Sequence, residues 1–243
     1  MLRSFRSWAS GILTASAVGA GCTPADATLP DEVEPEAVAY QEGVASAPVH
    51  VIYFADYVCD DCARFSKTAA APLREEWIQP GRARLTVVDL AWHRGSVAGS
   101  AAAVCAAEQE EFWAMHEMLF ERQETWKRAV DIPAALEEYA TELELDLDEF
   151  RSCASREGHQ DRLNAAEETT RRFAVRGTPA FVVNGKLFYG SQDWAWVEQV
   201  LAAHERGTPE EAPAPPFRSP PEAGAAEATE AAEAAEAATD SAR

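Results

Sequence analysis

Two cysteines separated by two residues, Cys59 and Cys62, are the side chains of this sequence best suited to chemistry. They follow the apolar run of residues 49–54, so we expect them where a strand turns into a helix. A helix N-terminus carries partial positive charge and free N–H groups, which favour a thiolate over a thiol at Cys59. The thiolate is the attacking species in disulfide exchange, and a second thiol three positions on can resolve the mixed disulfide. The spacing therefore predicts a redox dithiol.

A second motif, Gly177-Thr178-Pro179, lies more than a hundred residues further along the chain. With this motif, the sequence resembles the DsbA-type thiol:disulfide oxidoreductases, a thioredoxin-fold family with a helical insertion, over roughly residues 47–205. The matching stretches are residues 51–59, 62–65, 108–120 and 177–185. The resemblance implies that Cys59 attacks and Cys62 resolves. It also implies that Thr178 and a cis Pro179 line the substrate groove.

Two positions depart from the family's usual pattern. Asp60 stands where a proline often follows the first cysteine, and Tyr53 stands where many members carry a buried glutamate. Tyr53 puts in doubt the proton transfer that such a glutamate is thought to assist during resolution. The carboxylates of Asp60 and Asp61 disfavour a neighbouring thiolate, so they raise the pKa of Cys59 relative to a dipeptide that contains histidine. We therefore expect a less oxidising disulfide than that of the strongest periplasmic oxidases.

Composition restricts the classes of function. The 243 residues allow one good-sized domain with tails, or two small domains. A formal net charge of −20, with no basic stripe, argues against nucleic-acid binding. We expect no metal at Cys59 and Cys62, because no further cysteine or histidine pair offers the remaining ligands at usable spacing. No organic cofactor is expected either, since the two sulfurs carry the electrons.

Both ends of the sequence differ in character from its middle. Residues 1–22 are typical of an export signal, and they end in a sequence resembling a bacterial lipobox with Cys22 as the lipidated residue. Gly19 stands where leucine is usual in that motif, and ordinary cleavage nearby is the alternative. No segment is long enough to span a bilayer. Residues 23–46 indicate a flexible acidic linker, and residues 207–243 a disordered Pro/Ala/Glu-rich tail.

The cysteine count bears on the lipid anchor. The sequence has five cysteines, and lipidation of Cys22 would leave an even number. Beside the Cys59–Cys62 pair, Cys105 and Cys153 could then form a structural disulfide within the helical insertion, as in some relatives. Both could instead be buried free thiols.

Between the termini we predict one α/β domain over residues 47–206, with a thioredoxin-like fold and an inserted helical subdomain at about residues 97–172. Strands are expected over residues 50–56, 84–89, 180–184 and 186–189, with Asn184-Gly185 as a hairpin turn. Helices are expected over residues 59–77, with a kink at Pro72, and over residues 192–203. Among the histidines, we expect His116 in the core and His93 in a loop that could approach the active site. His50, His159 and His204 are expected at the surface or at strand edges.

Together these features predict an exported protein of the bacterial periplasm or cell envelope, held to a membrane by a lipid anchor only. It would exchange disulfides with exported cysteine-containing proteins, in the direction of oxidative folding, and a membrane redox partner would recycle its dithiol. Two alternatives stay open. The Asp-Asp dipeptide favours a reductase or isomerase of the same fold. The departures at Tyr53 and Asp60 favour a non-catalytic thioredoxin-like binding lipoprotein.

Overall fold

A computed structural model of the chain describes residues 30, 32–156 and 158–214. Its centre is a five-stranded sheet with the strand order β1-β3-β2-β4-β5. The strands are β1 (Tyr40–Glu42), β2 (Val49–Ala55), β3 (Ala83–Asp89), β4 (Ala180–Val183) and β5 (Lys186–Tyr189). β2 runs parallel to β3 and antiparallel to β4, and β4 and β5 form the predicted hairpin. Its turn, Asn184-Gly185, has positive φ at both residues, 44° and 81°, as a two-residue turn of this kind requires.

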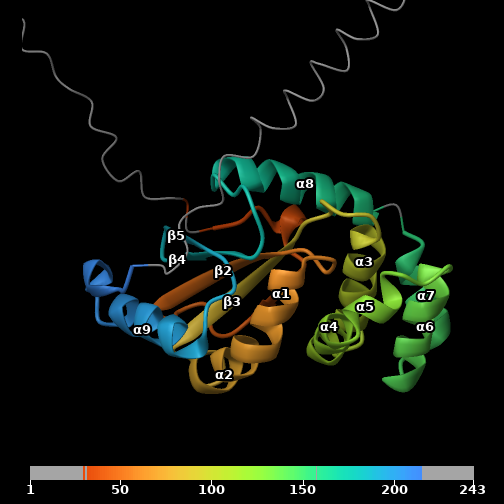
Figure 1. Cartoon of the computed structure of the whole chain (residues 1–243), viewed down its shortest axis with the longest axis horizontal. Coiled ribbons are helices and arrows are strands. Elements are labelled where there is room, and N and C mark those ends of the chain that lie inside the picture. The colour runs from red at the N-terminus through yellow and green to blue at the C-terminus, as the bar shows by residue number, and fades with distance from the viewer. Residues whose placement is uncertain (1–29, 31, 157, 215–243) are drawn as a thin grey trace, which may run out of the picture.

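Helices surround the sheet (Figure 1). They are α1 (Asp60–Phe65), α2 (Ala71–Leu73), α3 (Ser96–Ala107), α4 (Phe112–Glu121), α5 (Gln123–Trp126), α6 (Ile132–Glu142), α7 (Leu147–Ala154), α8 (Gly158–Arg172) and α9 (Trp194–Glu205). The predicted helix over residues 59–77 is present, but two wider π-helical turns, Ser66–Ala70 and Arg74–Ile78, interrupt it on either side of α2. α2 contains Pro72, which has no N–H to donate to the preceding turn.

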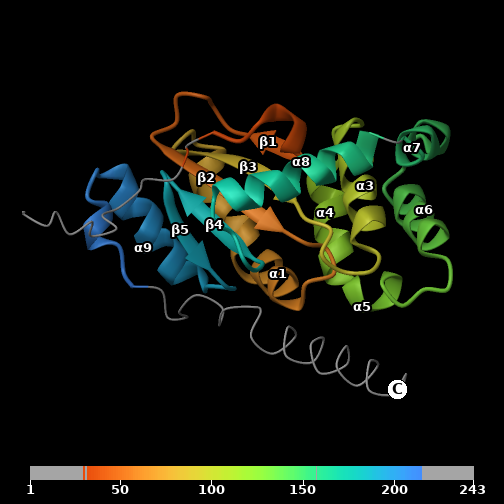
Figure 2. The ribbon, with the colours of Figure 1, turned by 90° about the horizontal axis from the view of Figure 1, so that it is seen from above.

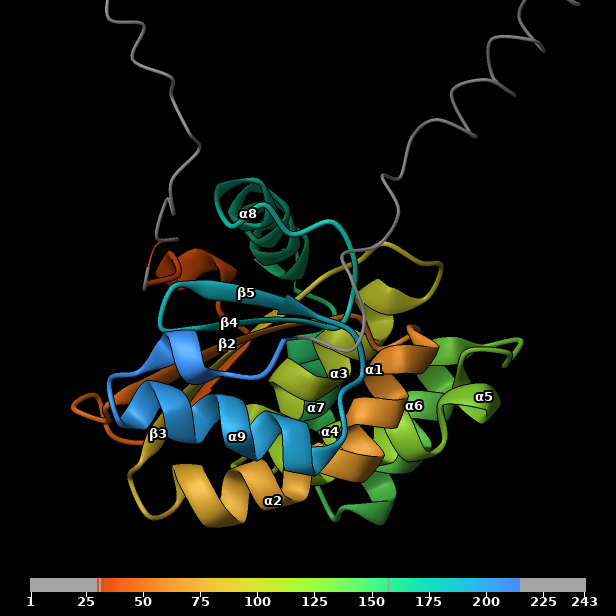
Figure 3. The ribbon, with the colours of Figure 1, turned by 60° about the vertical axis from the view of Figure 1, so that its left-hand side comes forward.

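The alternation of side chains along β2 divides the core into two layers. Ile52 and Phe54 face a cluster that includes Phe173 and residues of α8. Val51 and Tyr53 face the larger cluster, which includes residues of α1, α2 and α9. Figure 3 shows α8 on one side of the sheet and α1, α2 and α9 on the other, and Figure 2 shows α8 crossing over the strands. The predicted thioredoxin-like fold is confirmed.

The inserted helices follow β3 and gather at one end of the molecule (Figure 1). α3 to α7 form this helical subdomain, and their apolar side chains continue the larger core cluster. The predicted insertion at about residues 97–172 is therefore present, although its last helix, α8, returns to cover the sheet. His116 of α4 lies in the core as expected, with only 1% of its surface exposed.

The structure corrects several boundaries and placements. The folded domain begins before residue 47, because β1, within the predicted flexible linker, pairs with β3 through Tyr40 and Val87. The start of the predicted disordered tail also makes contacts, since Trp196 donates a hydrogen bond to the carbonyl of Ala214. Cys22 and residues 215–243 lie outside the described residues. Within the described part of the chain, no helix has the length and apolar character needed to cross a membrane.

Three histidines lie elsewhere than the sequence suggested. His50, His159 and His204 are 5%, 8% and 7% exposed, so all are buried rather than at the surface. His50 shares a hydrogen bond with Thr86 of the neighbouring strand, and His159 shares one with the carbonyl of Cys153. Hydrogen-bonding partners of this kind allow an imidazole to be buried at little cost.

Candidate active site

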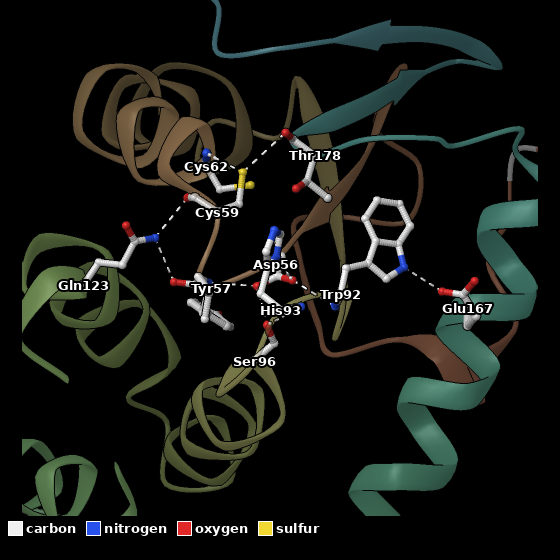
Figure 4. A network of polar contacts seen from close by, with 11 residues as sticks. Asp56, Tyr57, Cys59, Cys62, Trp92, His93, Ser96, Gln123, Glu167 and Thr178 are labelled. Atoms are coloured by element: carbon white, nitrogen blue, oxygen red, sulfur yellow. Dashed lines mark hydrogen bonds and ion pairs between the residues drawn. The ribbon is translucent and has the colours of Figure 1, made fainter. Parts of the chain in front are cut away.

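The Cys59–Cys62 pair lies where β2 passes into α1, as the sequence predicted (Figure 4). Cys59 is the N-cap of α1, with extended backbone angles, and its sulfur accepts a hydrogen bond from the peptide N–H of Cys62 at 3.4 Å. A helix begins here because the chain turns after the strand and the N-cap side chain serves a free N–H group of the first turn. Both cysteines of the pair are free thiols in this structure.

The two thiols have opposite acidities. The pKa of Cys59 is lowered from 9.0 to about 6 by hydrogen bonds from the side chains of Cys62 and Thr178 and from the peptide groups of Cys62 and Asp61. Partial burial opposes this lowering. Cys62 is fully buried, and that burial, its hydrogen bond with Cys59 and the charge on Cys59 raise its pKa well above the ordinary value. At neutral pH the accessible sulfur is therefore a thiolate and the buried sulfur a thiol.

The loop before β4 faces the pair across the site. The Thr178–Pro179 peptide bond is cis, and the sulfur of Cys59 lies 3.3 Å from the carbonyl oxygen of Thr178. The carbonyl of Pro179 accepts a hydrogen bond from Gly190 in the segment after β5, which ties the loop to the sheet. The structure thus brings Thr178 against the sulfur that the sequence assigns to attack on disulfides.

Tyr53, at the position where the resemblance led us to look for a glutamate, belongs to the apolar core. Its ring stacks on Phe181 with the centroids 4.9 Å apart and packs against Phe65. Burial raises the pKa of Tyr53 well above its ordinary value, so the phenol stays neutral and cannot take up a proton as a carboxylate would. No carboxylate relay exists at this position.

Asp56, three residues before Cys59, is a functional candidate that the sequence reasoning missed. Its carboxylate is fully buried and accepts hydrogen bonds from the peptide N–H groups of Val58 and Trp92, at 2.8 and 3.0 Å. It also accepts one from the Ser96 hydroxyl at 2.7 Å, and it lies 2.8 Å from Nδ1 of His93. These contacts fix the turn between β2 and Cys59 (Figure 4), and they place the half-exposed His93 beside the site.

A second side chain missed by the sequence reasoning, Gln123 of α5, secures the same turn. Its buried amide nitrogen donates to the carbonyls of Tyr57 and Cys59, each at 2.9 Å. No pattern in the sequence points to this residue, because it reaches the turn from the inserted subdomain. Asp56 gives a weak signal, as a charged residue at the end of an apolar strand.

The two aspartates between the cysteines each have a cationic partner. Asp60 pairs with Lys127 at 2.9 Å, and Asp61 pairs with Arg64 at 2.8 Å. A nearby cation offsets the repulsion that each carboxylate exerts on a thiolate. The carboxylates of both pairs are exposed and therefore screened by salt, so their net effect on Cys59 is small.

The remaining cysteines described by the structure lie in the helical subdomain. Cys105 of α3 and Cys153 of α7 form a disulfide, with their Cα atoms 5.6 Å apart. The bridge joins two helices of the insertion. Among the described residues, Cys59 and Cys62 are therefore the free cysteines.

A strand that leads to a CxxC pair on a helix N-terminus, faced by a cis-proline loop, defines a thioredoxin-fold dithiol protein. Comparison with known families agrees: residues 39–203 match the model of a family described as thioredoxin. The chain belongs to this family.

Similar sequences carry two kinds of description. The chain is 23% identical over 172 residues to disulfide bond formation protein D of Bacillus subtilis, covering 68% of this chain and 76% of that protein. It is 33% identical over 153 residues to Na(+)/H(+) antiporter NhaA 3 of Salinispora tropica, covering 61% of this chain. The chain spans only 22% of the length of that antiporter.

Solved structures share the fold, including its inserted helices. BdbD from Bacillus subtilis superposes with a TM-score of 0.63 at 20% identity, covering 72% of this chain and 97% of that one. Wolbachia pipientis α-DsbA1 superposes with a TM-score of 0.62 at 15% identity, covering 69% of this chain and 91% of that one. The fold is thus of the DsbA type.

Proposed function

We propose that this chain is a protein-disulfide oxidoreductase that forms disulfides in other proteins through the Cys59–Cys62 pair. One observation carries the proposal: the accessible sulfur of Cys59 caps the start of α1, 3.3 Å from the carbonyl oxygen of Thr178, while the thiol of Cys62 is fully buried. The lowered pKa of Cys59 and the raised pKa of Cys62 agree with it. The description of the Bacillus subtilis relative as a disulfide bond formation protein supports the same activity.

The geometry supports the following reaction. In the oxidised protein, a substrate thiolate attacks Cys59 Sγ, the accessible sulfur, and the Cys59–Cys62 bond breaks. Cys62 leaves as a thiolate and takes up a proton, because its buried position favours the neutral thiol. A second substrate thiolate then attacks the substrate sulfur of the mixed disulfide and expels Cys59. Two electrons pass from the substrate dithiol to the pair, and the substrate gains a disulfide.

The difference in acidity favours oxidation over reduction. Cys59 is the leaving group of the last oxidative step, and a thiol of lower pKa leaves faster. In the reducing direction Cys62 must become a thiolate to resolve the mixed disulfide, and its raised pKa makes that step slow at neutral pH.

The proposal includes partners and a location. The substrates are exported proteins with pairs of cysteines, and a membrane redox protein takes the electrons from the reduced pair. The export signal and lipobox-like end of residues 1–22 support a place in the bacterial periplasm or cell envelope, with Cys22 as the membrane anchor. Replacing Cys22 with alanine should prevent attachment of the lipid at this residue.

The oxidation of a reduced peptide with two cysteines tests the activity. The oxidised protein should form the peptide disulfide stoichiometrically, and the Cys59→Ser variant should not. The Cys62→Ala variant should instead accumulate a mixed disulfide with a peptide activated for exchange, because only Cys59 can then react. Equal peptide oxidation by the Cys59→Ser variant would rule out the proposed activity.

A further inference from the structure

The helical subdomain holds a second group of metal-ligating side chains, outside the Cys59–Cys62 site. Cys105, Cys153 and His159 come from α3, α7 and α8, and all three are buried. The imidazole Nε2 lies 3.7 Å from Cys105 Sγ and 3.9 Å from Cys153 Sγ, so one nitrogen faces both sulfurs of the disulfide. Two thiols and an imidazole are the donor set preferred by soft metal ions.

The distances already suit a tetrahedral metal site. Zn²⁺ binds thiolate sulfur at about 2.3 Å and imidazole nitrogen at about 2.0–2.1 Å, so in a tetrahedron a nitrogen and a sulfur ligand lie about 3.6 Å apart. The two distances from His159 Nε2 are 3.7 and 3.9 Å. The two sulfur ligands of such a site lie about 3.8 Å apart, so the main change needed is to open the disulfide.

A cavity lies next to this buried group, on the side of Cys105. It has a volume of about 340 Å³, and Cys105 forms part of its wall. Glu108, Asp148 and Glu149 bring three carboxylates to the same cavity, against the guanidinium of Arg156, which pairs with Glu108. The excess of negative charge attracts a cation, and a water can take the fourth position on the metal.

We propose that, when the Cys105–Cys153 disulfide is reduced, the two thiolates and His159 bind a Zn²⁺ ion. A dithiol reductant supplies the two electrons: its thiols become a disulfide, and Cys105 and Cys153 each gain a hydrogen. Binding of Zn²⁺ then releases two protons from the thiols. α3 and α7 are thus joined by a disulfide in the oxidised chain and by a metal ion in the reduced one.

His159 changes its role between the two states. In the disulfide state its Nε2 lies 2.8 Å from the carbonyl oxygen of Cys153, so this nitrogen carries the hydrogen and donates it. A metal needs the lone pair of Nε2, so the hydrogen must move to Nδ1. Reduction and metal binding therefore shift the tautomer of a single buried histidine.

The test uses the full-length chain with Cys22, Cys59 and Cys62 replaced by serine, so that Cys105 and Cys153 are the remaining cysteines. The protein is reduced with a phosphine, transferred to oxygen-free buffer and titrated with Co²⁺ as a coloured substitute for Zn²⁺, followed by competition with Zn²⁺. Matched variants carry His159→Gln or His204→Gln, the latter at a buried histidine of α9. Far-UV circular dichroism follows the helix content.

We expect the reduced chain to bind one Co²⁺ with a thiolate charge-transfer band, and the oxidised chain to bind none. His159→Gln should weaken binding at least tenfold, and His204→Gln should leave it unchanged. If reduction lowers the helix content, Zn²⁺ should restore it. The proposal fails if the reduced chain binds no Co²⁺, or if the His159→Gln variant binds Co²⁺ as tightly as the parent. It also fails if reduction lowers the helix content and Zn²⁺ does not restore it. None of these outcomes depends on the Cys59–Cys62 activity.

Discussion

The acidity of Cys59 should depend on the side chain at residue 62. The hydrogen bond with the Cys62 thiol is the largest of the effects that lower the pKa of Cys59 to about 6. Alanine at residue 62 removes this donor, while serine keeps an O–H group near the same place. We therefore predict that Cys62→Ala raises the pKa of Cys59 and that Cys62→Ser leaves it nearly unchanged.

The expected change is about one pKa unit. A hydrogen bond to a charged group contributes about 1.5–3 kcal/mol, and one unit corresponds to about 1.4 kcal/mol. Because Cys59 is partly exposed, water replaces some of the lost stabilisation, and the lower end of the range applies. A rise from about 6 to about 7 lowers the thiolate fraction from roughly 50% to 10% at pH 6, and from roughly 90% to 50% at pH 7.

The rate of alkylation by iodoacetamide between pH 4 and 10 measures this fraction, since the thiolate is the species that reacts. The Cys62→Ser and Cys62→Ala variants each retain a single thiol at the site, so their curves can be compared directly. A Cys62→Ala curve with its midpoint still near 6 would refute the assigned role of the Cys62 hydrogen bond. An equal rise in the pKa of Cys59 in both variants would refute it as well.

Three further predictions concern stability. The folded-state pKa of Cys59 lies below its unfolded value, so the reduced form should gain stability over the oxidised form as pH rises from about 6 towards 9. This gain should be lost as pH falls through about 6, and melting temperatures of both forms at several pH values measure it. Gln123→Ala leaves two carbonyls without their donor and should lower the free energy of unfolding in urea by about 1–3 kcal/mol. Gln199→Ala, on the exposed surface of α9, should lower it by less than about 0.5 kcal/mol. Burial lowers the pKa of His116 to about 3, below the unfolded value of 6.5. The free energy of unfolding should therefore fall below about pH 6.5, by up to about 1.4 kcal/mol for each pH unit. His116→Gln should remove this contribution to the pH dependence of the free energy of unfolding.

The sequence was sufficient for the elements that local patterns define. The apolar run of β2, the CxxC pair at the helix start and the Asn184-Gly185 turn each depend on a few adjacent residues, and all three are where we predicted them. β1 was missed because its three residues are paired on one side only and carry little apolar signal. Its place is determined by hydrogen bonds to β3, which the local pattern does not reveal.

The side chains that support the site were harder to predict for the same reason. Gln123 and Lys127 reach the CxxC turn from the inserted helices, and the contact exists only once the insertion packs against α1. His159 looked like a surface residue because α8 is mainly polar, yet its position in the helix directs it onto the disulfide. Contacts between segments distant in sequence are a property of the packed fold, which a single sequence shows only through a family resemblance.

The reduction potential of the Cys59–Cys62 pair, measured against glutathione buffers, shows whether the chain forms disulfides in other proteins or reduces them. A thiolate stabilised at Cys59 favours the reduced pair and so makes its disulfide an oxidant. We predict a potential between about −120 and −200 mV, in the range of proteins that donate disulfides. A potential near about −270 mV would contradict it and would assign the chain to reduction instead.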